Sequence, residues 1–139
     1  MTLPGPESDT AASLAARLAT APRLNAPDEA AKSVATWVAG LGDGDRAALD
    51  ALLVAYPLLP TLLQSLTESS PFLWELASRE PDRLVRLLRS DPERGFARLL
   101  SETARAVAAT ADEAEASRLL RRMKGEAALL IALADIGGV

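Results

Sequence analysis

The sequence predicts an all-α fold of about eight short helices in an irregular, orthogonal bundle. Alanine and leucine fill 53 of the 139 positions whereas valine and isoleucine fill only eight, so strong helix formers greatly outnumber β-branched residues. Prolines that follow Ser, Glu or Asp recur along the chain, and proline fits the first turn of a helix but breaks its interior. We expect residues 1–7 to be disordered and residues 8–139 to form one helical unit.

Two helices are predicted in the N-terminal part of the chain. We expect Ser8 or Asp9 to cap the first helix, which ends at the proline-containing stretch 22–27. The second helix begins near Asp28, because apolar residues then recur at intervals of three and four and define one buried stripe. It ends at the glycine-rich segment 40–44.

The next two helical segments, up to residue 66, are expected to form the most buried part of the fold. Asp45 is predicted to cap a leucine-rich helix, which ends at Tyr56-Pro57 before residues 58–66 continue in helical form. Three more helix starts share a polar residue followed by proline: Ser70-Pro71, Glu80-Pro81 and Asp91-Pro92.

The last helix, about residues 112–136, is predicted to be the longest. Asp112 and Glu115 have the spacing of a capping box, and glycines from Gly137 onward end the helix. Residues 127–134 are apolar on every side of the helix, so we expect them to be buried all round or to await a partner. The candidate residues for packing against a further domain are Leu129, Leu130, Ile131, Leu133 and Ile136.

The densest basic cluster of the chain also lies on this helix, and its members are Arg118, Arg121, Arg122 and Lys124. One interpretation is a polar contact with phosphate or with the carboxylates of a partner. The other, which we favour, is local pairing of Glu115 with Arg118 and of Glu126 with Arg122, because exposed pairs are common and contribute little. The arginines of residues 79–105 are interpreted as solvated faces of short helices.

Composition excludes several classes of function. The chain has neither histidine nor cysteine, which removes the usual general base, thiol nucleophiles and zinc ligands. A net charge of −4 gives no broad attraction for nucleic acid, and the longest uncharged stretch is shorter than the roughly 20 residues that cross a bilayer. Because no signal or transit peptide is evident, we expect a cytoplasmic protein with no nucleic-acid or membrane partner.

The remaining candidate residues have structural interpretations. Asp43 and Asp45 alternate with glycine, as in some metal sites, but a helix follows at once, so we interpret them as a capped turn. The aromatic residues that could stack on a base or sugar each lie in or beside an apolar stripe and are expected in the core: Trp37, Tyr56, Phe72, Trp74 and Phe96. We therefore expect no catalytic residue, no cofactor and no metal in this chain.

Residues 118–136 resemble a segment of the bacterial bifunctional glutamine synthetase adenylyltransferase/adenylyl-removing enzymes. The family pattern is Leu-Arg-Arg-Phe-Arg-x-x-Glu-x-Leu-x-Ile-Ala-x-x-Asp-Leu, from which Met123 and Gly125 depart. A Ser-Pro-Phe-Leu step at residues 70–73 and a Pro-x-x-Leu step at residues 81–84 also resemble the family's helical N-terminal part. The positions that match, directly or within one residue, are Leu120, Arg121, Arg122, Glu126, Ile131, Ala132 and Asp135. Residues 135–139 look most like the alphaproteobacterial members.

The resemblance implies the helical N-terminal part of an enzyme that attaches AMP to a tyrosine of glutamine synthetase and removes it. In that family the chemistry belongs to nucleotidyltransferase domains with a Gly-Ser followed by Asp-x-Asp, which use ATP and magnesium. This motif is absent here on a strand-like background, so we expect a chain that is inactive alone and continues beyond Val139.

The implied partners are the nucleotidyltransferase domain in cis, glutamine synthetase and nitrogen-signalling proteins. The last helix is expected to pack against that domain, which gives the chain a structural role in an enzyme that regulates nitrogen assimilation. A free-standing α-helical protein-interaction module, with residues 127–134 as its partner face, is the alternative.

Overall fold

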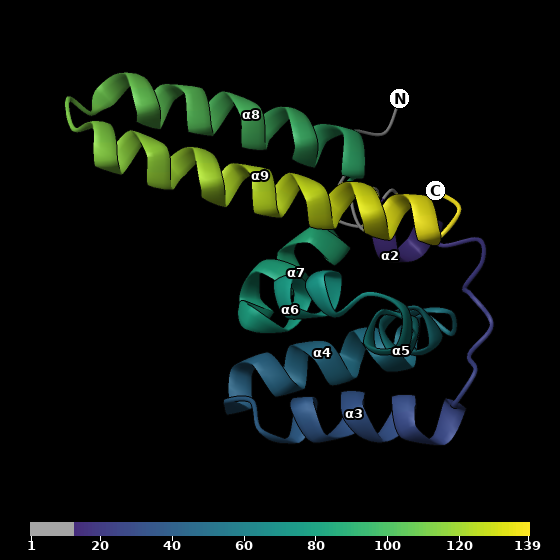
Figure 1. The fold of residues 1–139 in the computed structure, drawn as a ribbon. Coiled ribbons are helices and arrows are strands. Elements are labelled where there is room, and N and C mark those ends of the chain that lie inside the picture. The colour runs from purple at the N-terminus through teal and green to yellow at the C-terminus, as the bar shows by residue number, and fades with distance from the viewer. Residues whose placement is uncertain (1–12) are drawn as a thin grey trace, which may run out of the picture.

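A computed structural model describes residues 13–139, and these form eight helices and no strand (Figure 1). The all-α prediction is confirmed. The stretch 1–7 and the predicted caps Ser8 and Asp9 lie outside the described residues. The helices are α2 Leu14–Arg17, α3 Pro27–Ala39, α4 Asp43–Ala55, α5 Leu59–Ser69, α6 Pro71–Arg79, α7 Pro81–Arg89, α8 Pro92–Ala109 and α9 Glu113–Ile136.

The helices are stacked in three tiers (Figure 1). Helices α8 and α9 form a long antiparallel hairpin at one end of the molecule, α3 and α4 lie at the other end, and α5, α6 and α7 lie between them. The chain bends by 110° between α4 and α5, as expected for an orthogonal bundle. The hairpin is longer than the tiers below it, and one half of it projects beyond them (Figure 1).

Leucine fills the centre of the molecule. All four leucines of α5 are fully buried, as the sequence predicts for this segment, and Leu129 and Leu133 of α9 join them. Each buried leucine contributes about 1.5–3 kcal/mol relative to an exposed one. Helix α7 is as deeply buried as α5, because it packs against α2, α4 and α6. This burial of α7 is not predicted by the sequence.

Two of the three predicted polar-proline starts act as helix caps. The Leu73 N–H donates to Ser70 Oγ at 3.2 Å, and the Arg94 N–H donates to the Asp91 carboxylate at 3.1 Å. Glu80 does not cap α7, because its longer side chain carries the carboxylate away from the helix start and toward neighbouring arginines.

Two predictions about local structure are wrong. Helix α4 begins at Asp43 rather than after Asp45, with Gly42 in the cap position, so Asp45 lies in the first turn. Phe72 is not in the core: its side chain is exposed near the start of α6. Trp37 and Trp74 do pack together, edge to face with ring centroids 5.2 Å apart.

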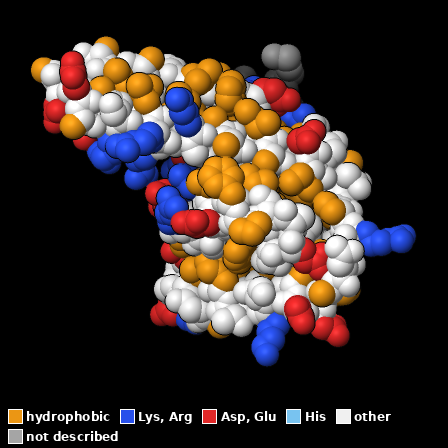
Figure 2. Space-filling view, viewed as in Figure 1, with side chains coloured by type: hydrophobic (Ala, Val, Ile, Leu, Met, Phe, Trp, Pro, Cys, Tyr) orange, Lys and Arg blue, Asp and Glu red, His pale blue; other side chains and the backbone are white. Residues whose placement is uncertain are grey.

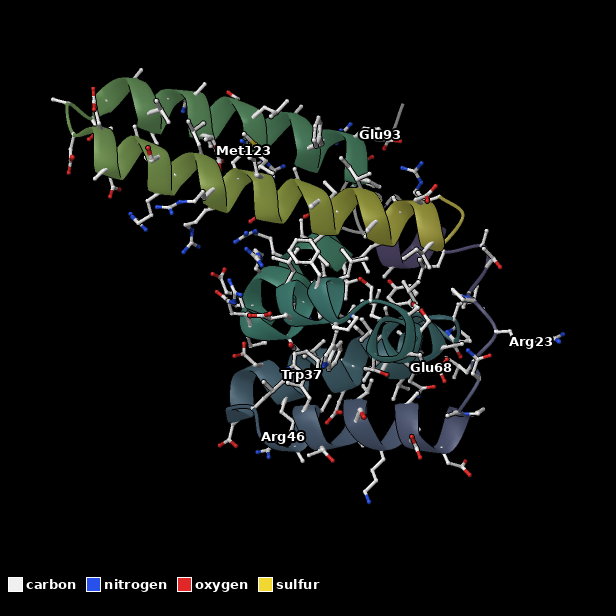
Figure 3. The ribbon with its side chains drawn as sticks, viewed as in Figure 1. Arg23, Trp37, Arg46, Glu68, Glu93 and Met123 are labelled. Carbon is white, nitrogen blue, oxygen red and sulfur yellow. The ribbon has the colours of Figure 1, made fainter. Side chains whose placement is uncertain are left out.

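Helix α2 and the residues that follow it are attached to the C-terminal ends of α7 and α9. The Leu14 N–H donates to the Ser90 carbonyl at 2.9 Å, and the Ala19 N–H donates to the Gly137 carbonyl at 2.8 Å. The Arg17 guanidinium forms an ion pair at 2.7 Å with Glu93, which lies at the start of α8 (Figure 3). The short α2 is therefore held by backbone contacts at the ends of α7 and α9.

Candidate functional site

Helix α9 carries all the candidate site residues and has the predicted extent. The Ala114 N–H donates to the Asp112 carboxylate at 3.0 Å, which confirms Asp112 as the cap. The second half of the predicted capping box is absent, because Glu115 pairs with Arg118 instead. Met123 faces α8 within the hairpin (Figure 3), so one side of α9 is occupied by its neighbour in sequence.

The apolar end of α9 has one buried side and one open side. Leu129, Leu130 and Leu133 are buried in the core of this chain, and Ile136 packs against the core while half-buried. Ile131 points away from the core and is 56% exposed. Only Ile131 of the five candidate packing residues is thus largely available to a further domain.

Ile131 shares its side of α9 with Leu120. The two lie 11 residues apart, which is close to three helical turns, so their side chains project in nearly the same direction about 16 Å apart. Leu120 is also exposed, and Lys124 lies between them by helical position. We call the stripe Leu120, Lys124 and Ile131 the outer face of α9.

The basic cluster of α9 is paired only in part. Arg118 donates to Glu115 through Nε at 3.0 Å and Nη2 at 2.6 Å. These hydrogen bonds lower the pKa of the Glu115 carboxyl and raise the pKa of Arg118. Local pairing is confirmed for this pair, whereas Arg121 and Lys124 form no ion pair within the described part of the chain.

The predicted pairing of Glu126 with Arg122 is wrong. Glu126 accepts from Arg86 Nη2 of α7 at 2.7 Å, and Arg122 Nη2 lies 3.4 Å from the Glu80 carboxylate. The reason is tertiary, because α7 and the α6–α7 junction bring charges against α9 that are closer than its own i+4 neighbour. Both ion pairs connect α9 to the middle tier.

A basic cleft of about 190 Å³ lies where α6, α7 and α9 meet. Figure 2 shows basic side chains gathered in the concave angle between the projecting hairpin and the body. The charged residues that line this cleft are Arg79, Glu80, Arg83, Arg118, Arg121 and Arg122.

The sequence analysis missed half of this cleft. Arg83 was grouped with the solvated arginines of residues 79–105, but it is only 5% exposed, so that interpretation is wrong for this residue. Arg83 lies four residues before Leu87, a helical spacing that turns it toward the apolar side of α7, and this signal was available. Arg79 and Glu80 approach α9 only because of the way the helices cross, and no pattern in the sequence around these two residues predicts it.

Two features are absent from residues 13–139. No single helix in this part combines the length and the apolar character needed to cross a membrane. Nor do three acidic side chains there approach one another as ligands of a metal ion would. Asp43 forms an ion pair with Arg46, in keeping with a structural turn.

Several known proteins similar to this chain share one name. A bifunctional glutamine synthetase adenylyltransferase/adenylyl-removing enzyme of Rhodopseudomonas palustris strain HaA2 is 54% identical over 128 residues, which are 92% of this chain and 13% of the relative. The enzyme of the same name from Bradyrhizobium diazoefficiens is 47% identical over 136 residues, which are 98% of this chain and 14% of the relative. That of Xanthobacter autotrophicus is 44% identical over 133 residues.

No family model and no solved structure matches the chain. The relatives are alphaproteobacterial, as the sequence resemblance predicted, and each is several times longer than this chain. Over nearly its whole length the chain is therefore homologous to one segment of the alphaproteobacterial bifunctional glutamine synthetase adenylyltransferase/adenylyl-removing enzymes, a segment that makes up 13–14% of their length.

Proposed function

We propose that this chain is a helical segment of an enzyme that attaches AMP to glutamine synthetase and removes it. Its role is structural: it packs against a nucleotidyltransferase domain and performs no catalysis alone. The homology supports this proposal, because the relatives carry that name and the chain corresponds to only 13–14% of their length. ATP, magnesium and the contacts with nitrogen-signalling proteins would belong to the rest of such an enzyme, which would act in the cytoplasm.

The observation that carries the packing role is the outer face of α9. Ile131 is exposed on a helical turn whose other large side chains, Leu129, Leu130 and Leu133, are buried. An exposed isoleucine and an exposed leucine on one stripe, with Lys124 between them, fit an apolar partner surface that carries an acidic group. Burial of Ile131 would contribute about 1.5–3 kcal/mol to such packing.

The test uses the full-length Bradyrhizobium diazoefficiens enzyme with its homologous segment replaced by this chain. Attachment of AMP to glutamine synthetase and its removal are both measured for the chimaera and for its Ile131→Asp variant. We expect the chimaera to retain both activities and Ile131→Asp to lower its thermal stability and at least one activity several-fold. Unchanged stability and activities in Ile131→Asp would contradict the packing role.

Val54→Asp is the matched control, because Val54 is 85% exposed and lies on α4, at the opposite end of the molecule from the hairpin. It introduces the same charge at an exposed apolar position and is expected to leave the chimaera unchanged. Leu130→Asp would not serve as a test, because Leu130 is buried and its replacement would unfold this chain itself.

The alternative, a free-standing interaction module, would use the same outer face as its partner surface. Light scattering of the isolated chain distinguishes the two. A module gives a defined monomer or dimer, whereas a segment of a larger enzyme forms progressively larger species as its concentration rises, through its uncovered apolar stripe.

A further inference from the structure

We propose that the basic cleft between α6, α7 and α9 binds a phosphate group. Five arginines and a single glutamate line it, and they come from the consecutive helices α6 and α7, with Glu80 between them, and from α9, which lies farther along the chain. Its volume of about 190 Å³ is below the roughly 300–1,000 Å³ of sites for whole drug-sized ligands. The cleft therefore suits a small anion or the anionic end of a larger molecule.

The charges around the cleft do not balance. Arg79 and Arg118 are each neutralised by a glutamate of their own helix, Glu75 and Glu115 respectively. Glu80 is shared, because it lies 3.7 Å from Arg83 Nη1 and 3.4 Å from Arg122 Nη2. Arg121 has no ion pair within the described part of the chain. Five guanidinium groups thus face three carboxylates, which leaves two positive charges.

The state of Arg83 is a second, independent observation. Its side chain is buried, and one hydrogen bond, from Nη2 to the Leu76 carbonyl at 2.9 Å, is well formed. Its Nε has no hydrogen-bond partner in the described structure, and its ion pair with Glu80 is long. A buried guanidinium is costly unless its charge is compensated, so an anion in the cleft would supply compensation that the protein groups lack.

Phosphate fits this site better than a carboxylate does. A phosphate dianion neutralises both unbalanced charges, whereas a carboxylate leaves one. Its oxygens accept hydrogen bonds from several guanidinium forks at once, which is the arrangement that arginines on α7 and α9 offer. The cleft lies on a different side of α9 from the outer face, so phosphate can bind there whether or not the outer face packs against another domain.

The test is a calorimetric titration of the 139-residue chain with inorganic phosphate at constant ionic strength. Arg121→Gln is compared with Lys124→Gln, a variant that removes the same charge three residues along α9 but lies outside the cleft. We expect saturable binding at one site, weakened about tenfold in Arg121→Gln by loss of a charge-assisted hydrogen bond and within twofold of the original in Lys124→Gln. Circular dichroism checks that both variants keep their helix content.

A substitution of opposite sign sharpens the test. Glu80→Gln removes the only carboxylate that lines the cleft and is expected to tighten phosphate binding several-fold. Ribose 5-phosphate is titrated in parallel: tighter binding than inorganic phosphate identifies a phosphorylated metabolite as the source of the group, and equal binding identifies the free ion. The proposal is overturned by absence of saturable binding, by equal weakening in Lys124→Gln, or by acetate binding as tightly as phosphate.

Discussion

Two glycines near the ends of the apolar part of α9 differ in what a side chain would meet. A Cβ at Gly125 would lie 3.5 Å from Leu76 Cδ2, an ordinary contact, whereas a Cβ at Gly137 would overlap the Leu18 side chain and approach the Leu133 carbonyl oxygen to 2.9 Å. Gly125 therefore lies in the helix with no steric need for glycine, while Gly137 is required for α2 to approach α9.

We predict opposite effects of alanine at these positions. Gly125→Ala stabilises the fold by about 0.5–1 kcal/mol, because glycine loses more backbone entropy in a helix than alanine does. Gly137→Ala destabilises it, because Leu18 and the segment after α2 must move away. Urea unfolding of the isolated chain measures both changes, and destabilisation by Gly125→Ala would show that α6 and α9 pack more tightly than the structure indicates.

The ion pair between Arg17 and Glu93 gives a prediction about pH. The hydrogen bond from Arg17 lowers the pKa of the Glu93 carboxyl from 4.5 to about 2. Because this pKa is lower in the folded chain than in the unfolded chain, the pair stabilises the fold above about pH 4.5, and this contribution is lost as the pH falls through about 2. Arg17→Gln should move the Glu93 pKa back toward 4.5 in an NMR titration of the side-chain carboxyls. A pKa that stays near 2 in this variant would assign the shift to the start of α8 alone.

At the scale of the helix, α3 depends on a residue far away in sequence. Its cap residue, Ala26, has no side chain that accepts a hydrogen bond. The Glu68 carboxylate of α5 instead accepts from the N–H of this cap residue, Ala26, at 2.5 Å and from the N–H of Asn25 before it at 2.9 Å, which caps the start of α3 from another helix (Figure 3). The segment that leads into α3 is therefore held to α5, in addition to the packing of the two helices against each other.

We predict that Glu68→Ala costs about 1 kcal/mol of stability, the usual effect of removing a helix cap. Glu102→Ala, at an exposed position on α8, is the control and should change stability by less than about 0.5 kcal/mol. Chemical denaturation gives both values, and hydrogen exchange should show faster exchange of the Asn25 and Ala26 amides only in Glu68→Ala. Equal losses in the two variants would contradict the tertiary cap.

The hairpin of α8 and α9 differs from the other helices in how little it buries. Pro92 is the only buried residue of the 18 in α8, and the buried residues of α9 lie in its last two turns. The Arg86–Glu126 and Glu80–Arg122 pairs attach the hairpin to the middle tier at the sides of the basic cleft. The projecting half of the hairpin therefore has solvent or a partner on most of its surface.

For the molecule as a whole, the sequence predicts the local features of each helix but not how the helices cross and pack against one another. The caps Ser70, Asp91 and Asp112 could be predicted because each accepts a hydrogen bond from an amide only two or three residues farther along the chain. The Glu68 cap, the burial of Arg83 and the Arg86–Glu126 pair were not, because each joins residues that only the packing of helices brings together. The same limit applied to the site, whose α9 residues were found and whose α6 and α7 residues were missed.

In the whole molecule, helix α9 has two sides to which we assign proposed roles. One side of α9 lines the basic cleft together with residues of α6 and α7. The other side is the outer face, which points away from the core and on which Ile131 is the most exposed apolar residue. We propose that another domain covers the outer face in the enzymes that contain this segment. Because the chain has no cysteine, a single introduced thiol reports its coverage directly.

The most direct measurement is the maleimide labelling rate of Ile131→Cys, compared by peptide mass spectrometry between the isolated chain and the Bradyrhizobium diazoefficiens chimaera. Val54→Cys is the exposed control in both. We expect Ile131→Cys to react at least about tenfold more slowly in the chimaera, because packing that buries this position contributes about 1.4 kcal/mol or more, and Val54→Cys to react equally in both. Equal labelling of Ile131→Cys in the chain and in the chimaera would contradict the packing role of α9.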